Sequence, residues 1–114
     1  MCMTKMNYSK IKFELTNSIR NLELVNELLI REKADVQALS EVEYWIRTLE
    51  LLRNSLYDCI DVYEGQLNIE ESVKEIREEI ANFYTITKGT YTSIVYAKIK
   101  NAWQGCKIVE EQYK

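Results

Sequence analysis

Paired carboxylates are the first residues in this sequence that could do chemistry. Three pairs stand close together in the chain: Asp58 with Asp61, Glu70 with Glu71, and Glu78 with Glu79. Carboxylates serve as general acids or bases and bind divalent cations. Carboxylate sites in helical bundles, however, use inward-facing glutamates with histidine partners. The glutamate pairs here fall on the polar positions of a helical pattern, so we expect a solvated helix face.

The cysteines are the second candidates, because a thiolate is a nucleophile. Cys2, Cys59 and Cys106 are odd in number and form no CxxC motif, which differs from the disulfide framework of a small secreted domain. Cys59 and Cys106 fall on apolar helix faces, where cysteine acts as a small hydrophobe. The N-terminus has no apolar signal segment. We therefore expect a cytoplasmic protein with reduced thiols.

Other enzyme signatures are missing from the chain. The sequence has no histidine, no GxGxxG or P-loop glycine run and no HExxH motif. Without histidine, the commonest general base and metal ligand is lost. The sequence predicts a protein that is not an enzyme and has no catalytic residues, metal or cofactor.

One group of aromatic and basic residues has the spacing of a binding surface. Tyr96, Lys100, Trp103 and Lys107 recur at steps of four, three and four, roughly 90° around a helix from its core stripe. Trp and Tyr are enriched at protein interfaces, and aromatic–lysine combinations suit an acidic partner or base stacking. A second interpretation is that Trp103 widens the core face while the lysines extend to solvent. The sequence leaves both interpretations open.

A similar surface is predicted near the N-terminus. Phe13, Leu24 and Leu28 lie opposite the core stripe of a helix expected over residues 8–33. A helix that is apolar on two faces lies centrally in a bundle or packs against another chain. We expect a protein partner, in a homodimer or a hetero-oligomer.

Four amphipathic segments must position these residues. Helices are expected over 8–33, over 40–63 and from Asn68 onward, and a fourth ends near Tyr113. Ser40–Glu43 resembles a capping box that starts the second helix, and Gly65 suits its end. Asn68 suits the start of the third. The predicted apolar stripes are Ile11, Leu15, Ile19, Leu22, Val25 and Leu29; Val42, Trp45, Leu49, Leu52, Leu56, Cys59 and Tyr63; Ile69, Val73, Ile76, Ile80 and Phe83; and Val95, Ile99, Ala102, Cys106, Val109 and Tyr113.

The segment 84–93 has two interpretations. It is rich in β-branched and aromatic residues, and Lys88-Gly89 would suit a hairpin turn. A lone hairpin has no sheet to join here. The sequence therefore favours two helices separated at Gly89, with a small irregular or hairpin segment as the alternative.

Composition agrees with a bundle. The 114 residues contain no proline and three glycines, and 46% are hydrophobic, with no apolar run approaching the ~20 residues of a membrane span. The sequence predicts one all-α domain, a four-helix bundle over residues 1–114, with no membrane partner.

Charge is unevenly distributed. The net charge is −3, but residues 40–87 carry four basic and eleven acidic groups, whereas residues 88–114 carry five basic and two acidic ones. Nucleic-acid binders need a basic footprint. The acidic middle therefore argues against nucleic acid as the main partner, although a small basic patch remains at the C-terminal end.

Three stretches of residues 20–105 carry a family resemblance: an opening helix that ends in Glu27–Glu32, a helix that begins near Leu39–Glu41, and Glu78–Ala81 through Ala97–Ala102. In these stretches the chain resembles the helical domain of archaeal GINS DNA-replication factor subunits. The resemblance implies a non-catalytic scaffold that joins sister subunits and bridges a replicative helicase to its partners.

The sequence thus predicts a non-enzymatic protein–protein interaction or scaffold subunit of a larger assembly. A replisome-type complex is one candidate for that assembly. The alternative is a small ligand-binding or inhibitor protein of viral type, which sequesters a small molecule or blocks a host protein. In that case Tyr91, Tyr96, Lys98 and Lys100 would line a pocket between helices or between subunits.

Overall fold

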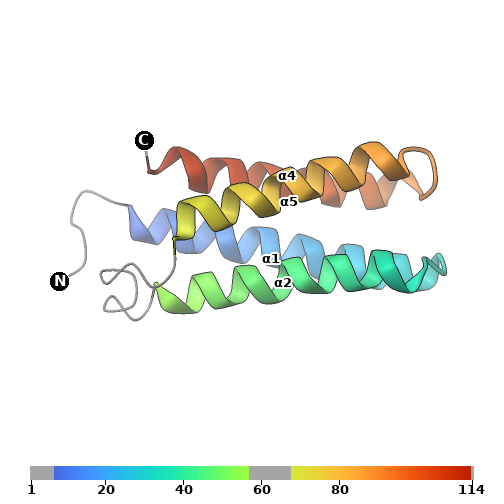
Figure 1. The fold of residues 1–114 in the computed structure, drawn as a ribbon, viewed down its shortest axis with the longest axis horizontal. Helices are drawn as coiled ribbons and strands as arrows, with labels where there is room; N and C mark the ends of the chain where they lie inside the picture. Colours follow the sequence, from blue (N-terminus) through green and yellow to red (C-terminus); the bar gives the residue numbers. More distant parts are fainter. Residues whose placement is uncertain (1–6, 57–67, 114) are drawn as a thin grey trace.

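The protein is all-α across the residues that its computed structural model describes, 7–56 and 68–113. The helices are α1 (Tyr8–Arg31), α2 (Val36–Ser55), α4 (Ile69–Thr87) and α5 (Ser93–Glu111). Each runs antiparallel to the one before it, so that α1 and α4 point one way and α2 and α5 the other (Figure 1). The expected four-helix bundle is confirmed.

The helices form two layers, with α1 and α2 in one and α4 and α5 in the other (Figure 1). Helix α1 contacts α2 and, more extensively, α5; α4 packs against α5 and touches α2 over a shorter stretch. The bundle is elongated, with extents of 46 × 22 × 18 Å. None of the described helices is both long and apolar enough to cross a membrane.

The core consists of the predicted stripes together with Ala38, and burial of each large side chain contributes about 1.5–3 kcal/mol. Tyr113, the last predicted stripe residue, lies beyond the end of α5 and is only partly buried. The buried stripe residues are Ile11, Leu15, Ile19, Leu22, Val25 and Leu29; Val42, Trp45, Leu49, Leu52 and Leu56; Ile69, Val73, Ile76, Ile80 and Phe83; and Val95, Ile99, Ala102, Cys106 and Val109. The predicted core positions Cys59 and Tyr63 lie outside the described residues, as do Asp58, Asp61 and Gly65.

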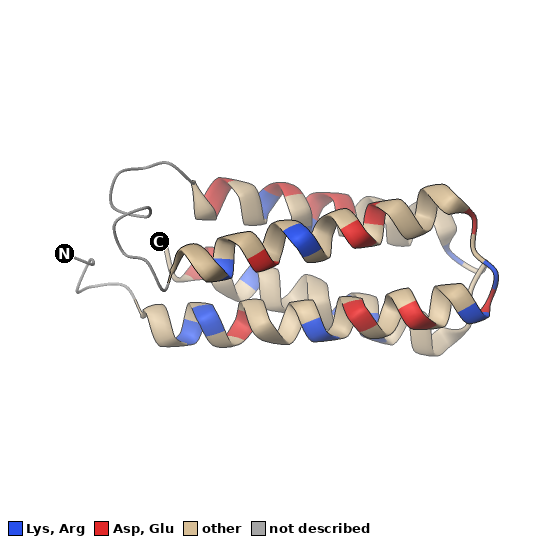
Figure 2. Cartoon of the chain, turned by 90° about the horizontal axis from the view of Figure 1, so that it is seen from below, with Lys and Arg blue, Asp and Glu red and all other residues tan. Residues whose placement is uncertain are grey.

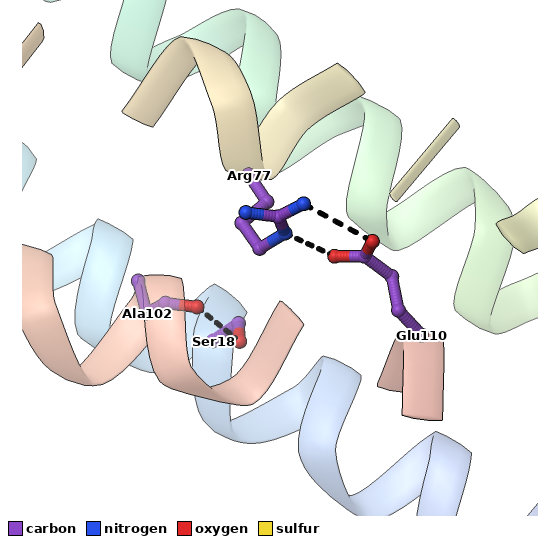
Figure 3. Close-up of polar contacts among 4 residues, drawn as sticks. All are labelled: Ser18, Arg77, Ala102 and Glu110. Carbon is purple, nitrogen blue, oxygen red and sulfur yellow. Dashed lines mark hydrogen bonds and ion pairs between the residues drawn. The ribbon is translucent and has the colours of Figure 1, made fainter. Parts of the chain in front are cut away.

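Helices α1 and α5 approach closely because small residues lie between them. The Ser18 hydroxyl donates a hydrogen bond to the carbonyl of Ala102 at 3.0 Å (Figure 3). At Gly105, a Cβ atom would stand 2.2 Å from Ser18 Oγ and 3.2 Å from the Glu14 carbonyl oxygen. Gly105 is therefore required by the packing of the two backbones.

The start of α2 differs from the prediction. The helix begins at Val36, and the side chain of Asp35 caps it by accepting a hydrogen bond from the Ala38 amide at 2.8 Å. Ser40 and Glu43 lie inside the helix, so the expected capping box is wrong. Asp35 offers the same acceptor chemistry one turn earlier, and the chain reaches it through a turn at Lys33, whose φ is +59°.

Two other predicted boundaries, the start of α4 and the break at Gly89, are confirmed, and α1 ends at Arg31, two residues short of its predicted end. The predicted end of the second helix at residue 63, followed by Gly65, lies outside the described residues. Asn68 caps α4 by accepting a hydrogen bond from the Glu71 amide at 3.0 Å. Segment 84–93 is not a hairpin, because α4 continues to Thr87 and α5 begins at Ser93. Gly89 lies in the turn between them, with φ at +86°.

The α4–α5 turn is tied to the α1–α2 turn at the same end of the bundle (Figure 1). The Thr92 amide donates to a carboxylate oxygen of Glu32 at 3.0 Å, and the Thr92 hydroxyl donates to the other oxygen at 2.5 Å. These bonds fix the position of the start of α5 relative to α1.

Candidate functional site

A groove of about 280 Å³ lies between α4 and α5. Buried Ile80 and Ile99 contribute to it from the core stripes of the two helices, and Ala81 leaves room because its side chain is small. Tyr84 and Trp103, which are both partly exposed, add aromatic surface. Thr85 and Lys100 complete the lining. The groove therefore combines an apolar lining with one ammonium group.

The positions of these residues follow from helix geometry. Ala81 and Tyr84 are three residues apart on α4, and Lys100 and Trp103 are three residues apart on α5. Residues at this spacing share one helix face. Each pair lies beside the core stripe of its own helix, so the two faces meet where α4 packs against α5. The groove is the part of this seam that the small Ala81 leaves unfilled.

Cationic groups surround the Trp103 ring. Lys107 Nζ lies 5.3 Å from the ring centroid and the Arg77 guanidinium carbon lies 5.9 Å from it, within the range of cation–π attraction. Arg77 also makes an ion pair with Glu110 across the α4–α5 interface (Figure 3). The hydrogen bond to this carboxylate raises the pKa of Arg77 above its ordinary value. Arg77 is therefore held beside the indole.

The predicted α5 residues divide into two groups. Lys100 and Trp103 line the groove, and Lys107 lies against the Trp103 ring. Tyr96 instead serves the turn before α5, where its hydroxyl donates to the Thr87 carbonyl and accepts a hydrogen bond from the Tyr91 amide at 3.2 Å. Its ring meets the groove only through an edge-on contact with Tyr84, with centroids 5.3 Å apart.

The predicted α1 residues lie elsewhere on the molecule. Phe13 is 68% exposed in a groove whose described lining residues all come from α1, and Leu24 is 42% exposed in a groove between α1 and α2. Leu28 packs partly buried against the core. The two predicted sets thus lie in different grooves.

Sequence reasoning missed the α4 side of the groove. Ala81, Tyr84 and Thr85 gave no signal as a set, because only the pairing of α4 with α5 places them beside Trp103. The i,i+3 relation of Ala81 and Tyr84 was available, but it is common in any helix.

Within one copy of the chain, the four residues of the alternative hypothesis do not line a single groove. Among its four residues, only Lys100 lines the α4–α5 groove. Tyr91 stacks on Phe83, with centroids 6.3 Å apart and ring planes within 5°, and burial raises its pKa. Both tyrosines of the set therefore pack within the end of the bundle.

The Cys106 thiol and the Glu78–Glu79 carboxylate pair lie in different surroundings. Cys106 is fully buried, and its burial raises the pKa of the thiol to about 12, so that the reactive thiolate is disfavoured. Glu78 is exposed, whereas Glu79 accepts a hydrogen bond from the Trp45 indole at 2.8 Å. Over residues 7–56 and 68–113, no three Cys, Asp or Glu side chains gather into a group that could hold a metal ion.

Comparison with known proteins adds no relative: no family model, no curated protein and no solved structure matches this chain. The resemblance to the GINS helical domain stays a prediction.

Proposed function

We propose that this protein is a non-enzymatic protein–protein interaction module, and that the α4–α5 groove holds side chains of its partner. The observation that carries the proposal is the groove itself, an apolar recess with Tyr84 and Trp103 in its lining. Large aromatic residues in such recesses contribute much of the binding energy at protein interfaces.

The open shape of the groove favours a protein partner over a small molecule. Small-molecule sites enclose most of the ligand. The groove, of about 280 Å³, is instead open to solvent. A recess of this kind suits one or two side chains projecting from a helix or an extended segment. Sister subunits of a replication complex, which the GINS resemblance implies, are one prediction for the partner.

Site-specific photocrosslinking in native cells tests the proposal. The photoreactive residue p-benzoylphenylalanine replaces Thr85, which lines the groove, or Leu51, an exposed residue of α2, in separate proteins. We expect a discrete protein adduct from position 85 and none from position 51. The adduct should be lost when Trp103→Ala is added, while helicity by circular dichroism is retained.

Equal adducts from both positions, or an adduct that survives Trp103→Ala unchanged, would contradict the proposal. A thermal-shift screen with nucleotides and other metabolites tests the small-ligand alternative separately, because ligands that bind the folded state raise its melting temperature.

A further inference from the structure

The groove carries a positive charge that is not neutralised from within. Lys100 lines it, and across the described residues its ammonium makes no hydrogen bond or ion pair. Lys107 adds a second ammonium beside Trp103. Arg77 differs from these lysines because Glu110 already pairs with it. The two lysines are therefore available to an anionic partner.

The Trp103 indole N–H is a further available donor. Trp45 shows the ordinary arrangement, in which the buried indole donates to a carboxylate, that of Glu79. No corresponding bond is formed by Trp103 within the part of the chain that the structure describes. An indole at an interface commonly gains a hydrogen bond when it is covered. Trp103 thus offers both an apolar ring and a polar edge.

The acidic residues of α4 lie on more than one face of the helix. Glutamates recur along α4 (Figure 2). At about 100° per residue, Glu75 lies roughly 120° around α4 from Ala81 and Glu79 roughly 160°, whereas Glu78, three residues before Ala81, lies roughly 60° from it. Positive charge comes from the α5 side, where Lys100 lines the groove and Lys107 lies beside Trp103.

We infer that the groove binds an acidic amphipathic segment of another protein. A large apolar side chain of that segment enters between Tyr84 and Trp103, and a neighbouring carboxylate accepts hydrogen bonds from the Lys100 ammonium and the Trp103 indole. This inference rests on the proposed function and specifies the chemistry of the partner. Because charge-assisted hydrogen bonds form at the edge of an apolar recess, a segment with both an apolar side chain and a carboxylate should bind better than a segment with only one of them.

Charge distinguishes this partner from two others. A second copy related by a two-fold axis through the groove would bring the Lys100 side chains of both copies together, and like charges oppose such pairing. A nucleic acid would satisfy the lysines, but its continuous phosphates would also pass Glu78, which lies on the groove side of α4. A peptide carries few carboxylates and can place them at the lysines only.

The test uses the full chain labelled with ¹⁵N and two blocked peptides of about 16 residues, roughly four helical turns. One contains leucine and glutamate in an amphipathic pattern, and the other has glutamine in place of every glutamate. The two indole N–H resonances report separately. We expect the glutamate peptide to shift the Trp103 resonance, leave the Trp45 resonance in place, and bind about ten-fold more tightly than its counterpart.

Matched variants show which lysine contributes to binding of the glutamate peptide. Lys100→Glu should weaken binding of the glutamate peptide about ten-fold, whereas Lys98→Glu, the same change on α5 outside the groove lining, should alter it less than two-fold, or about 0.4 kcal/mol. Ala81→Leu fills the groove and should abolish binding of both peptides.

Three results would overturn the inference: equal affinity for the two peptides, equal loss in Lys98→Glu and Lys100→Glu, or no shift from either peptide. Tighter binding of a short oligothymidine strand would overturn it in favour of nucleic acid. A discrete adduct from position 85 in the photocrosslinking experiment, together with any of the first three results, would leave the proposed function standing and remove only the acidic partner.

Discussion

Single atoms decide the packing at Gly105. An alanine there would gain helix propensity of about 1 kcal/mol. Its Cβ would stand 2.2 Å from Ser18 Oγ, however, so the hydroxyl must rotate and lose its bond to the Ala102 carbonyl. A buried hydroxyl without a partner costs about 1–3 kcal/mol, and the nearby Glu14 carbonyl resists any further shift.

We therefore expect Gly105→Ala to lower the free energy of unfolding by up to about 2 kcal/mol, as measured by urea denaturation. Ser18→Ala removes the obstructing oxygen, so adding Gly105→Ala to that variant should cost less than about 0.5 kcal/mol. Equal costs in the two backgrounds would show that Ser18 is not the obstacle.

Cys106 predicts a loss of stability in alkali. Its pKa in the folded protein is about 12, against an ordinary value of 9.0, because burial disfavours the thiolate. Between these values the unfolded chain binds fewer protons than the folded one, so stability is full below the lower value and falls as the pH rises. For one such group, the free energy of unfolding falls by up to about 1.4 kcal/mol per pH unit.

Comparing the native protein with Cys106→Ala isolates this slope. Between about pH 9 and pH 10, the native protein should lose roughly 1 kcal/mol more than the variant in urea denaturation. Staying below pH 10 also limits the contribution of Tyr113, whose pKa is raised by burial to about 12. Parallel pH profiles for the two proteins would contradict the prediction. The cavity left by the variant lowers its stability equally at both pH values.

At the scale of elements, the helix boundaries depend on side chains that compete to cap the same amides. The Asp35 carboxylate accepts from the Ala38 amide, so α2 starts one turn before Ser40. We expect Asp35→Ala to cost about 1 kcal/mol of unfolding free energy. Ser40→Ala, within the helix, should change it by less than about 0.5 kcal/mol in either direction. A larger loss of unfolding free energy in Ser40→Ala than in Asp35→Ala would contradict this prediction and support a cap at Ser40.

The elements show how far the sequence could predict the structure. The stripes were readable because each apolar residue recurs every three or four positions, and Asn68 was readable because glutamates follow it in the first turn. The start of α2 was not, since Asp35 and Ser40 offer equivalent oxygens and only the turn at Lys33 selects between them. Gly89, by contrast, marked the break between α4 and α5 correctly.

The candidate site was predictable only on one side. The spacing of Lys100 and Trp103 on α5 indicated a surface stripe, and the structure puts both in a groove. Tyr84 could not be predicted as their neighbour, because helix order around a bundle is a tertiary property. Tyr96 had the right spacing, but its hydroxyl is used by the Thr87 carbonyl.

At the scale of the whole molecule, the helices are unequally coupled. Helix α1 packs against both α2 and α5, whereas α2 and α4 meet over a short stretch. That stretch is spanned by Trp45, whose ring meets Phe83 edge-on at 5.6 Å and whose indole donates to Glu79. One large side chain thus joins the least extensive of these helix pairs.

Native-state hydrogen exchange should show this difference. Backbone amides open with free energies that rise with local burial and contact. We expect the slowest exchange in the middle of α1 around Ser18, and faster exchange in α2 and α4 near Trp45. Exchange measured by NMR or mass spectrometry checks the order. Slowest exchange in α2 or α4 would contradict it.

The α1–α5 interface has a consequence for biosynthesis. Ser18 and Ala102, which meet there, are 84 positions apart in the chain. During translation α1 therefore emerges from the ribosome long before α5, and the part of its apolar stripe that α5 covers is exposed until then. A messenger truncated before α5 would yield a product in which the α5-facing part of that stripe stays exposed, which cellular proteases and chaperones would be expected to remove.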